Sequence, residues 1–249
     1  MSPLGSACSC GAVHEESATG FCPSDWSRRS LLRTGVALTA GAMAGWGSNI
    51  VLPKLARAQT QMTPDAALQA MMDGNKRFTQ AQMTSFNDDL KLLKEHTAEA
   101  QAPFAAILSC ADSRVPVELV FDQTIGHLFV TRVAGNIATA DLIASLEYGA
   151  AVLGTKAIMV LGHANCGAVK ATIDGKAVPG QISVLYRSIR PAVDQAGPNL
   201  DAAIKANAKI QAGLLRTASP VLAEQIKANQ LKIVAAYYDL ASGAVTLLD

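Results

Sequence analysis

The stretch FAAILSCADSR, residues 104–114, passes from an apolar run directly into a cysteine followed by Asp, Ser and Arg. Similar short apolar runs follow at 127–133, 157–161 and 231–238. Segments with helical spacing of apolar residues lie between or beside them, at 139–153, 200–215 and 220–229. Apolar runs of this length that alternate with helices are typical of buried parallel strands. The sequence therefore predicts an α/β fold with a mostly parallel central β-sheet flanked by helices.

An N-terminal helical arm is expected before the sheet and a C-terminal β-hairpin after it. Thr63 can cap a helix whose first position is Pro64, and apolar residues at helical spacing follow. A second, more polar helix is expected over residues 87–100. At the other end, residues 239–249 contain a Ser-Gly turn and predict the hairpin. Because no long linker separates these parts, residues 59–249 are expected to form one domain.

Two segments hold the residues suited to chemistry, FAAILSCADSR and VLGHANCG (residues 160–167), each at the end of a predicted strand. In open α/β sheets, ligands bind at the carboxyl ends of the strands, where neighbouring loops converge. We therefore expect Cys110, His163 and Cys166 to meet. Two thiolates and one imidazole suit zinc, and three protein ligands leave one tetrahedral position open, as in catalytic zinc sites.

A carboxylate and a guanidinium follow Cys110 closely in the chain. Asp112 is near enough to reach the open position on the metal. Arg114 is near enough to bind that carboxylate through two hydrogen bonds. The other histidines after residue 58, His96 and His127, are expected to be structural.

This pattern resembles the β-class carbonic anhydrases. The resemblance runs from about Gly74 to the C-terminal hairpin and rests first on the Cys-x-Asp-x-Arg segment at 110–114 and the His-x-x-Cys-Gly segment at 163–167. Supporting segments occur in the same order as in that family: GNKRF at 74–78, FDQ at 121–123, RVAGN at 132–136 and SLEYG at 145–149.

The resemblance implies a zinc enzyme that reversibly hydrates carbon dioxide to bicarbonate and a proton. It implies that Zn²⁺ is bound by Cys110, His163 and Cys166. It also implies that Asp112 and Arg114 form the catalytic pair. In a closed form of the site, Asp112 would become the fourth zinc ligand.

The family further implies a homodimer, or a multiple of dimers, with exchanged N-terminal helices. Gln123 would then line the carbon dioxide pocket of the adjacent subunit. The chain departs from the family pattern at Ala164 and Asn165, where many members have Ser or Asp after the histidine. One subgroup has an extra bicarbonate pocket that uses a tryptophan, and here the tryptophans are Trp26 and Trp46, both before residue 59. That pocket is not expected.

Two other functions stay open on the sequence. Proteins of the same architecture hydrolyse carbon disulfide or carbonyl sulfide, and the metal ligands do not discriminate among these substrates. Alternatively, Cys110 and Cys166 could form a reversible disulfide in a zinc-storage or redox protein, since a disulfide is the default for two cysteines in an oxidising compartment. The pair of Asp112 and Arg114 counts against storage and redox roles, which need neither group.

Residues 1–58 differ from the rest of the chain. Arg28 and Arg29 precede a Gly/Ala-rich apolar stretch at 34–52, and Ala-Arg-Ala then forms a small-x-small cleavage site. This arrangement resembles a twin-arginine (Tat) signal peptide. We therefore expect export of the folded precursor by the Tat machinery and a mature periplasmic protein that starts near Gln59.

A membrane anchor is the alternative for residues 34–52, but their glycines disfavour a stable spanning helix. Cys8, Cys10 and Cys22, with His14, precede the paired arginines and are expected to be lost with the leader rather than to hold a metal. A formal net charge of +1 and only 16% charged residues give no basic stripe, so no nucleic-acid partner is expected.

Overall fold

The computed structural model describes residues 60–87 and 90–248, so the predicted signal peptide at 1–58 lies outside the described residues. A five-stranded sheet has the order β2-β1-β3-β4-β5. Its parallel strands are β1 (Ala105–Ser109), β2 (Leu128–Arg132), β3 (Ala157–His163) and β4 (Lys232–Tyr238). β5 (Val245–Leu247) pairs antiparallel with β4. The expected mostly parallel sheet and C-terminal hairpin are confirmed, with β4 itself as the hairpin's first strand.

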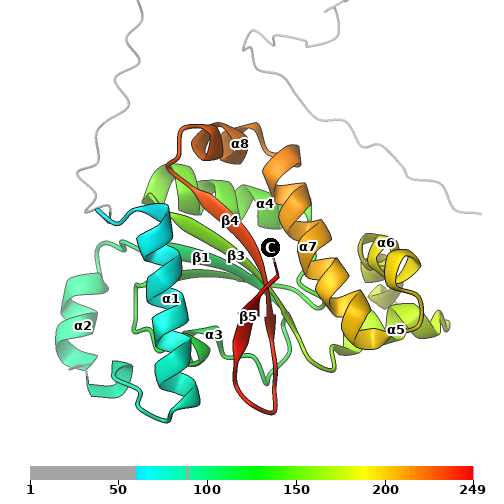
Figure 1. The fold of residues 1–249 in the computed structure, drawn as a ribbon. Helices are drawn as coiled ribbons and strands as arrows, with labels where there is room; N and C mark the ends of the chain where they lie inside the picture. Colours follow the sequence, from blue (N-terminus) through cyan, green and yellow to red (C-terminus); the bar gives the residue numbers. More distant parts are fainter. Residues whose placement is uncertain (1–59, 88–89, 249) are drawn as a thin grey trace, which may run out of the picture. The chain divides into compact units, whose positions relative to one another are not determined.

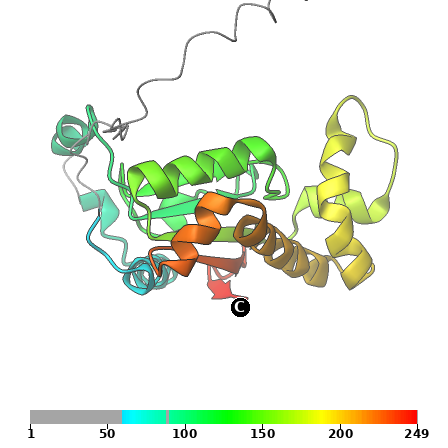
Figure 2. The ribbon, with the colours of Figure 1, turned by 90° about the horizontal axis from the view of Figure 1, so that it is seen from above.

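Helices cover both faces of the sheet (Figures 1 and 2). One face packs against α1 (Pro64–Thr79) and α3 (Val117–Val120). The other face packs against α4 (Ala140–Glu147), its π-helical continuation η2 (Tyr148–Leu153), α7 (Leu200–Ala218) and α8 (Pro220–Lys227). The remaining elements are η1 (Ser85–Asn87), α2 (Leu90–Thr97), α5 (Gly167–Asp174), η3 (Ile182–Leu185) and α6 (Tyr186–Ala196). Figure 2 shows α5 and α6 projecting beyond the sheet.

Some elements differ from the sequence-based expectation. β3 runs two residues beyond the predicted 157–161 because its last residues pair with Tyr237 and Tyr238 of β4, which makes His163 the end of the strand. β2 was expected to be buried but is largely half-buried, since it is an edge strand with a single neighbour. The helix expected over 87–100 is the shorter α2, and none of its residues is buried.

A buried asparagine fastens α1 to the C-terminal hairpin. Asn75 donates from Nδ2 to the carbonyls of Val120 at 3.1 Å and Gly243 at 2.9 Å, and its Oδ1 accepts from the Val245 amide at 2.8 Å. Gly243 has a left-handed φ of 75°, and a Cβ there would lie 2.9 Å from the Phe78 ring. The turn therefore needs glycine for both its conformation and this close approach.

A buried carboxylate fastens the segment after α1 to the segment after α3. Asp122 is 3% exposed and accepts hydrogen bonds from Arg77 Nε at 2.5 Å, the Thr84 amide at 3.0 Å and the Ser85 amide at 2.9 Å. Burial alone would raise the pKa of Asp122. The bonds from Ser85, Arg77 and Thr84 outweigh burial and hold that pKa below its ordinary value.

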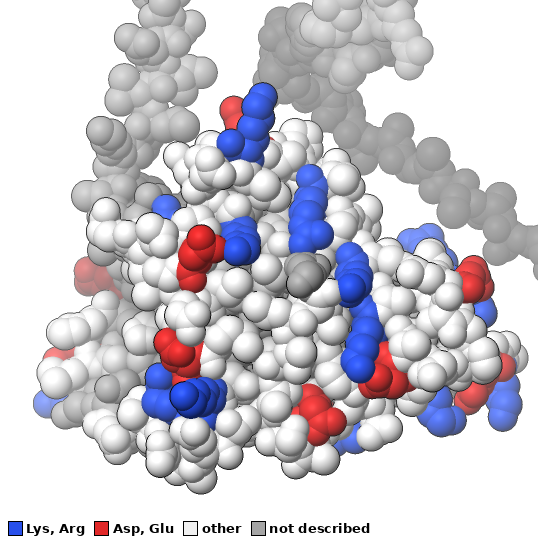
Figure 3. Space-filling model, viewed as in Figure 1, with Lys and Arg blue, Asp and Glu red and all other residues white. Residues whose placement is uncertain are grey.

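Charged side chains of both signs are interspersed on the face seen in Figure 3.

None of the helices between residues 60 and 248, residues 88 and 89 apart, has the length and apolar run that crossing a bilayer requires.

Asp122→Asn should remove a pH-dependent part of the stability. The folded-state pKa of Asp122 lies below the unfolded-state value of about 4, so its contribution is complete above about pH 5 and is lost as the pH falls below about 4. We expect Asp122→Asn to lower the free energy of unfolding by about 1–3 kcal/mol at neutral pH. Urea unfolding at several pH values measures this difference, which should shrink in acid.

The matched control is Asp73→Asn, which changes an exposed carboxylate on α1 and should alter the unfolding free energy little. A difference between wild type and Asp122→Asn that stays constant into strong acid would contradict the role given to the buried carboxylate.

Candidate metal centre

Cys110, His163 and Cys166 come together at the carboxyl ends of two neighbouring strands. Cys110 directly follows β1, His163 is the last residue of β3, and Cys166 is the N-cap of α5. β1 and β3 pair in register, with Ser109 opposite Leu161. The register thus sets the three side chains at one edge of the sheet, where the sequence predicted that they would meet.

The candidate ligand atoms, two sulfurs and one ring nitrogen, are buried and lie within 4.8 Å of one another. His163 Nδ1 lies 2.9 Å from the Ala164 carbonyl. A carbonyl oxygen only accepts, so Nδ1 carries the proton and Nε2 presents its lone pair. Among the described residues, the buried Nε2 has no hydrogen-bond partner. A histidine that donates from one ring nitrogen to a carbonyl and leaves the lone pair of the other nitrogen facing two sulfurs is arranged as metal-binding histidines are.

The surroundings of the two thiols favour a single thiolate. The hydrogen bond from Cys166 is the largest influence lowering the pKa of Cys110, and the Gly135 amide, 3.3 Å from Cys110 Sγ, acts in the same direction. The interaction with Cys110, together with burial, raises the pKa of Cys166. Because two adjacent buried thiolates repel each other, ionising both requires a cation between them.

Asp112 and Arg114 form a two-pronged ion pair next to this cluster. Arg114 Nε donates to Asp112 Oδ1 at 2.9 Å and Arg114 Nη2 donates to Oδ2 at 2.7 Å. Nη2 also donates to the Asn165 carbonyl at 3.3 Å. The side-chain bonds from Arg114 hold the pKa of Asp112 below its ordinary value, so the carboxylate is ionised at neutral pH. Asp112 Oδ2 lies 3.9 Å from His163 Nε2.

Arg132, the last residue of β2, holds the backbone that carries these groups. Its Nε donates to the Cys110 carbonyl at 2.9 Å and its Nη2 to the Asp112 carbonyl at 2.6 Å. In the sequence, Arg132 belongs to a segment that matches the family, and no role for it is predicted there. Its contacts span 20 or more residues of chain and depend on the β1–β2 register, which no local pattern reveals.

A cavity of about 380 Å³ opens beside the ion pair. Arg114 lines it from the loop after β1, Ala164 and Asn165 line it from the turn after β3, and residues 238–241 line it from the hairpin. The space is ample for a substrate of a few atoms.

Gln123 lies elsewhere in the chain. Its Nε2 donates to the Phe121 carbonyl at 3.0 Å, and its Oε1 lies 3.2 Å from His127 Nδ1. Neither contact involves a candidate metal ligand. Within one chain, the structure therefore does not bring Gln123 to the cluster.

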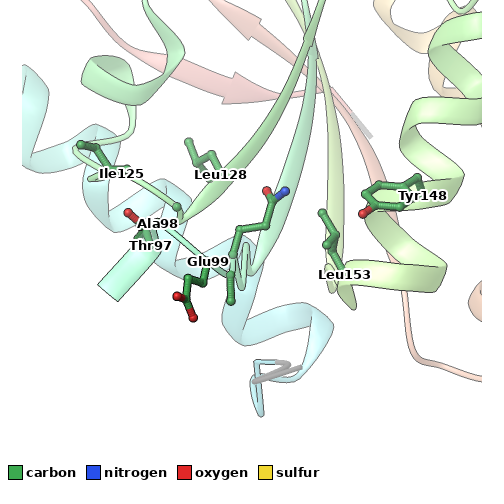
Figure 4. A pocket seen from close by; sticks show the side chains of 10 residues that line it. Thr97, Ala98, Glu99, Ile125, Leu128, Tyr148 and Leu153 are labelled. Atoms are coloured by element: carbon green, nitrogen blue, oxygen red, sulfur yellow. The ribbon is translucent and has the colours of Figure 1, made fainter. Parts of the chain in front are cut away.

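A second cavity, of about 640 Å³, lies at the opposite ends of the strands (Figure 4). Its lining includes Leu128, the first residue of β2, together with Tyr148 and Leu153 of η2. Leu128 pairs with Ala105, the first residue of β1, whereas Cys110 follows the last. This cavity is thus separate from the ligand cluster and lies along the edge strand of the sheet.

The donor set fits zinc. Two thiolates and an imidazole are ligands that zinc prefers, and three protein ligands leave a fourth tetrahedral position. Neither Cys110 nor Cys166 is in a disulfide. Over residues 60–87 and 90–248, these two cysteines and His163 are the only group of at least three potential metal-ligating side chains this close together. His96 and His127 are not part of it, and His14 with Cys8, Cys10 and Cys22 lies outside the described residues.

This chain is similar to known proteins both in its fold and in the sequence of the region that holds the candidate ligands. The family model described as carbonic anhydrase matches residues 105–245. The carbonic anhydrase of Mycolicibacterium smegmatis is 34% identical over 192 residues, which are 74% of this chain and 93% of that protein. A Coccomyxa β-carbonic anhydrase, solved in complex with acetazolamide, has a TM-score of 0.58 at 27% identity over 73% of this chain and 86% of its own.

A structure from a study of two tetrameric β-carbonic anhydrases of Sordaria macrospora shares the fold, with a TM-score of 0.57 at 21% identity over 64% of this chain and 90% of its own. The region that matches the family model begins with β1 and ends at the first residue of β5, so it contains all three candidate ligands and the ion pair. This chain belongs to the β-class carbonic anhydrase family.

Proposed function

We propose that this chain is a zinc-dependent carbonic anhydrase that catalyses the reversible hydration of carbon dioxide to bicarbonate and a proton. The observation that carries the proposal is the buried cluster of Cys110, His163 and Cys166 with the ionised Asp112 beside it. Membership of the family supports the reaction, and the donor set supports zinc.

The three ligands would hold Zn²⁺, which when bound makes water a nucleophile at neutral pH by lowering its pKa to about 7. Asp112 is ionised and can only accept hydrogen bonds, so it orients the attacking water toward carbon dioxide. Each carboxylate oxygen accepts more than one hydrogen bond, so Asp112 does this while bound to Arg114. If Arg114 released it, Asp112 would be free to become the fourth zinc ligand and close the site.

We further propose that the enzyme is a homodimer or a multiple of dimers, with the partner packed along β2 and α2. Leu90 and Leu92 on α2 are 60% and 52% exposed. Ile125 and Tyr148, near the edge strand, are 46% and 42% exposed. A second subunit would cover these apolar side chains, and Gln123 would then line the neighbouring subunit's substrate pocket, as the family resemblance implies.

We also propose that residues 1–58 are a Tat signal peptide and that the mature enzyme works in the periplasm. The paired arginines, the apolar stretch and the small-residue cleavage site support this assignment. Tat export carries a folded precursor, which suits an enzyme whose metal ligands are buried.

The purified mature protein should contain about one zinc per chain and should hydrate carbon dioxide. Cys110→Ser, His163→Ala and Cys166→Ser should each lose the zinc and most of the activity, because each removes one of the three metal ligands. Metal analysis and stopped-flow assays measure both quantities. The same assay with carbon disulfide and carbonyl sulfide tests the alternative substrates.

The control is Lys227→Ala, an exposed side chain on α8 outside both the ligand cluster and the surface proposed for the partner, which should keep full zinc and turnover. Active protein without zinc would refute the proposed metal, and turnover of only the sulfur compounds would refute the proposed substrate.

Arg114→Ala and Asp112→Ala should lose carbonic anhydrase activity for different reasons. Both should retain zinc, because neither removes one of the three ligands, and both should lose most activity. Without Arg114, the Asp112 carboxylate is free to bind the metal and block anions. Without Asp112, the attacking water is no longer oriented but the anion position stays accessible. Titration with an inhibitory anion should therefore show binding to Asp112→Ala and little to Arg114→Ala. Equal anion binding by the two variants, or near-normal turnover of either, would show that the pair is merely structural.

The double substitution Arg28→Lys with Arg29→Lys should keep the precursor in the cytoplasm, because the Tat machinery reads the paired arginines. Cell fractionation, with mass spectrometry of the mature N-terminus, measures export and cleavage near Gln59. The single change Arg33→Lys serves as control and should export normally. Normal export of the double variant would refute the signal assignment.

A further inference from the structure

We propose that Asn207 of α7 is a positioning residue for the metal centre and that it acts through Gly135 on the Cys110 sulfur. The inference rests on the proposed zinc site. Asn207 is a buried polar side chain, and no sequence motif points to it.

One residue connects Asn207 to the candidate ligand. Asn207 Nδ2 donates to the Gly135 carbonyl at 2.8 Å, and the Gly135 amide donates to Cys110 Sγ at 3.3 Å. The position of the amide that faces the sulfur therefore depends on where Asn207 holds the neighbouring carbonyl.

The segment that Asn207 holds includes a backbone conformation that is costly for one of its residues. Gly135 and Asn136 both have left-handed φ angles, of 80° and 43°. A Cβ at position 135 would lie 2.7 Å from Ile189 Cδ1, so the backbone passes close to α6. Glycine adopts a left-handed φ at no steric cost, whereas for Asn136 this conformation costs free energy and persists where the surrounding structure fixes it.

Gln211, one turn further along α7, completes the attachment. Its Oε1 accepts from the Ala138 amide at 2.9 Å, and its Nε2 donates to Asn207 Oδ1 at 3.2 Å and to the Ser188 carbonyl at 3.0 Å. Asn207 and Gln211 are 1% and 2% exposed. The bond from Gln211 to Oδ1 orients the Asn207 amide so that Nδ2 points to Gly135.

These two polar residues stand in an otherwise apolar stripe of α7 that includes Ala203, Ile204 and Ala208. A buried amide costs free energy unless its hydrogen bonds are made. Here the bonds go to residues 135 and 138, at the two ends of the segment that donates to Cys110. Partners that orient a metal ligand from outside the coordination shell commonly change metal affinity by about 10- to 100-fold when they are removed.

The test replaces Asn207 with leucine, which has the same number of side-chain heavy atoms, branched at the same carbon, and no hydrogen-bonding group. Competition with a chelator should show zinc bound about 10- to 100-fold more weakly than by wild type. In the cobalt-substituted protein, the thiolate-to-cobalt absorption band should move to lower energy, because a thiolate that loses a hydrogen-bond donor gives up an electron more easily.

Asn75→Leu is the matched control. Asn75 is 4% exposed and also donates to backbone carbonyls, but its partners are Val120, Gly243 and Val245 rather than the segment next to Cys110. This variant should lose stability in urea while its zinc affinity and cobalt band stay as in wild type.

A folded Asn207→Leu protein with wild-type zinc affinity and an unshifted band would overturn the inference. If Asn207→Leu does not fold, Gln211→Met takes its place, since it keeps the volume and removes the bonds to Asn207 and Ala138. An unchanged affinity and band in Gln211→Met would then overturn the inference, and a weaker affinity with a shifted band would support it. Failure of wild type to bind zinc would instead refute the proposed function.

Discussion

The in-register pairing of β1 and β3 is the constraint on which the rest of the structure depends. It sets the residues that follow β1 beside the end of β3, so that two buried sulfurs share one small volume with a histidine nitrogen that has no hydrogen-bond partner in the described part of the chain. Two thiols this close cannot both ionise without a cation, and a cation with three protein ligands keeps a position for a reactant. The chemistry that we propose therefore follows from how two strands align.

Around this cluster lies a set of polar groups whose bonds fix where the ligands and the carboxylate sit. Arg114 holds the Asp112 carboxylate, Arg132 holds the backbone on either side of it, and Asn207 holds the segment that donates to Cys110. Asn75 and Asp122 hold the helices and the hairpin in the same way, through bonds to residues outside the ligand cluster. Some buried polar groups in this fold thus position the candidate metal ligands and the carboxylate, and others attach the helices and the hairpin to one another.

The sheet and the meeting of the three candidate ligands were predictable because both follow from local patterns. Apolar runs mark the strands, and residues just after neighbouring parallel strands share an edge. The half-exposed state of β2 and the extra length of β3 were not predictable, because they depend on which strands become neighbours. The contacts of Arg132 and Asn207 likewise join segments far apart in the chain. The role of Gln123 stays a prediction, since it requires a second subunit.

The central claim is that one zinc is held by two sulfurs and one nitrogen, with a fourth position left for a reactant. X-ray absorption at the zinc edge of the purified, metal-loaded protein tests it most directly. The account predicts two sulfur neighbours at about 2.3 Å and lighter neighbours at about 2.0–2.1 Å. A shell of four sulfurs, or a shell with no sulfur, would contradict it.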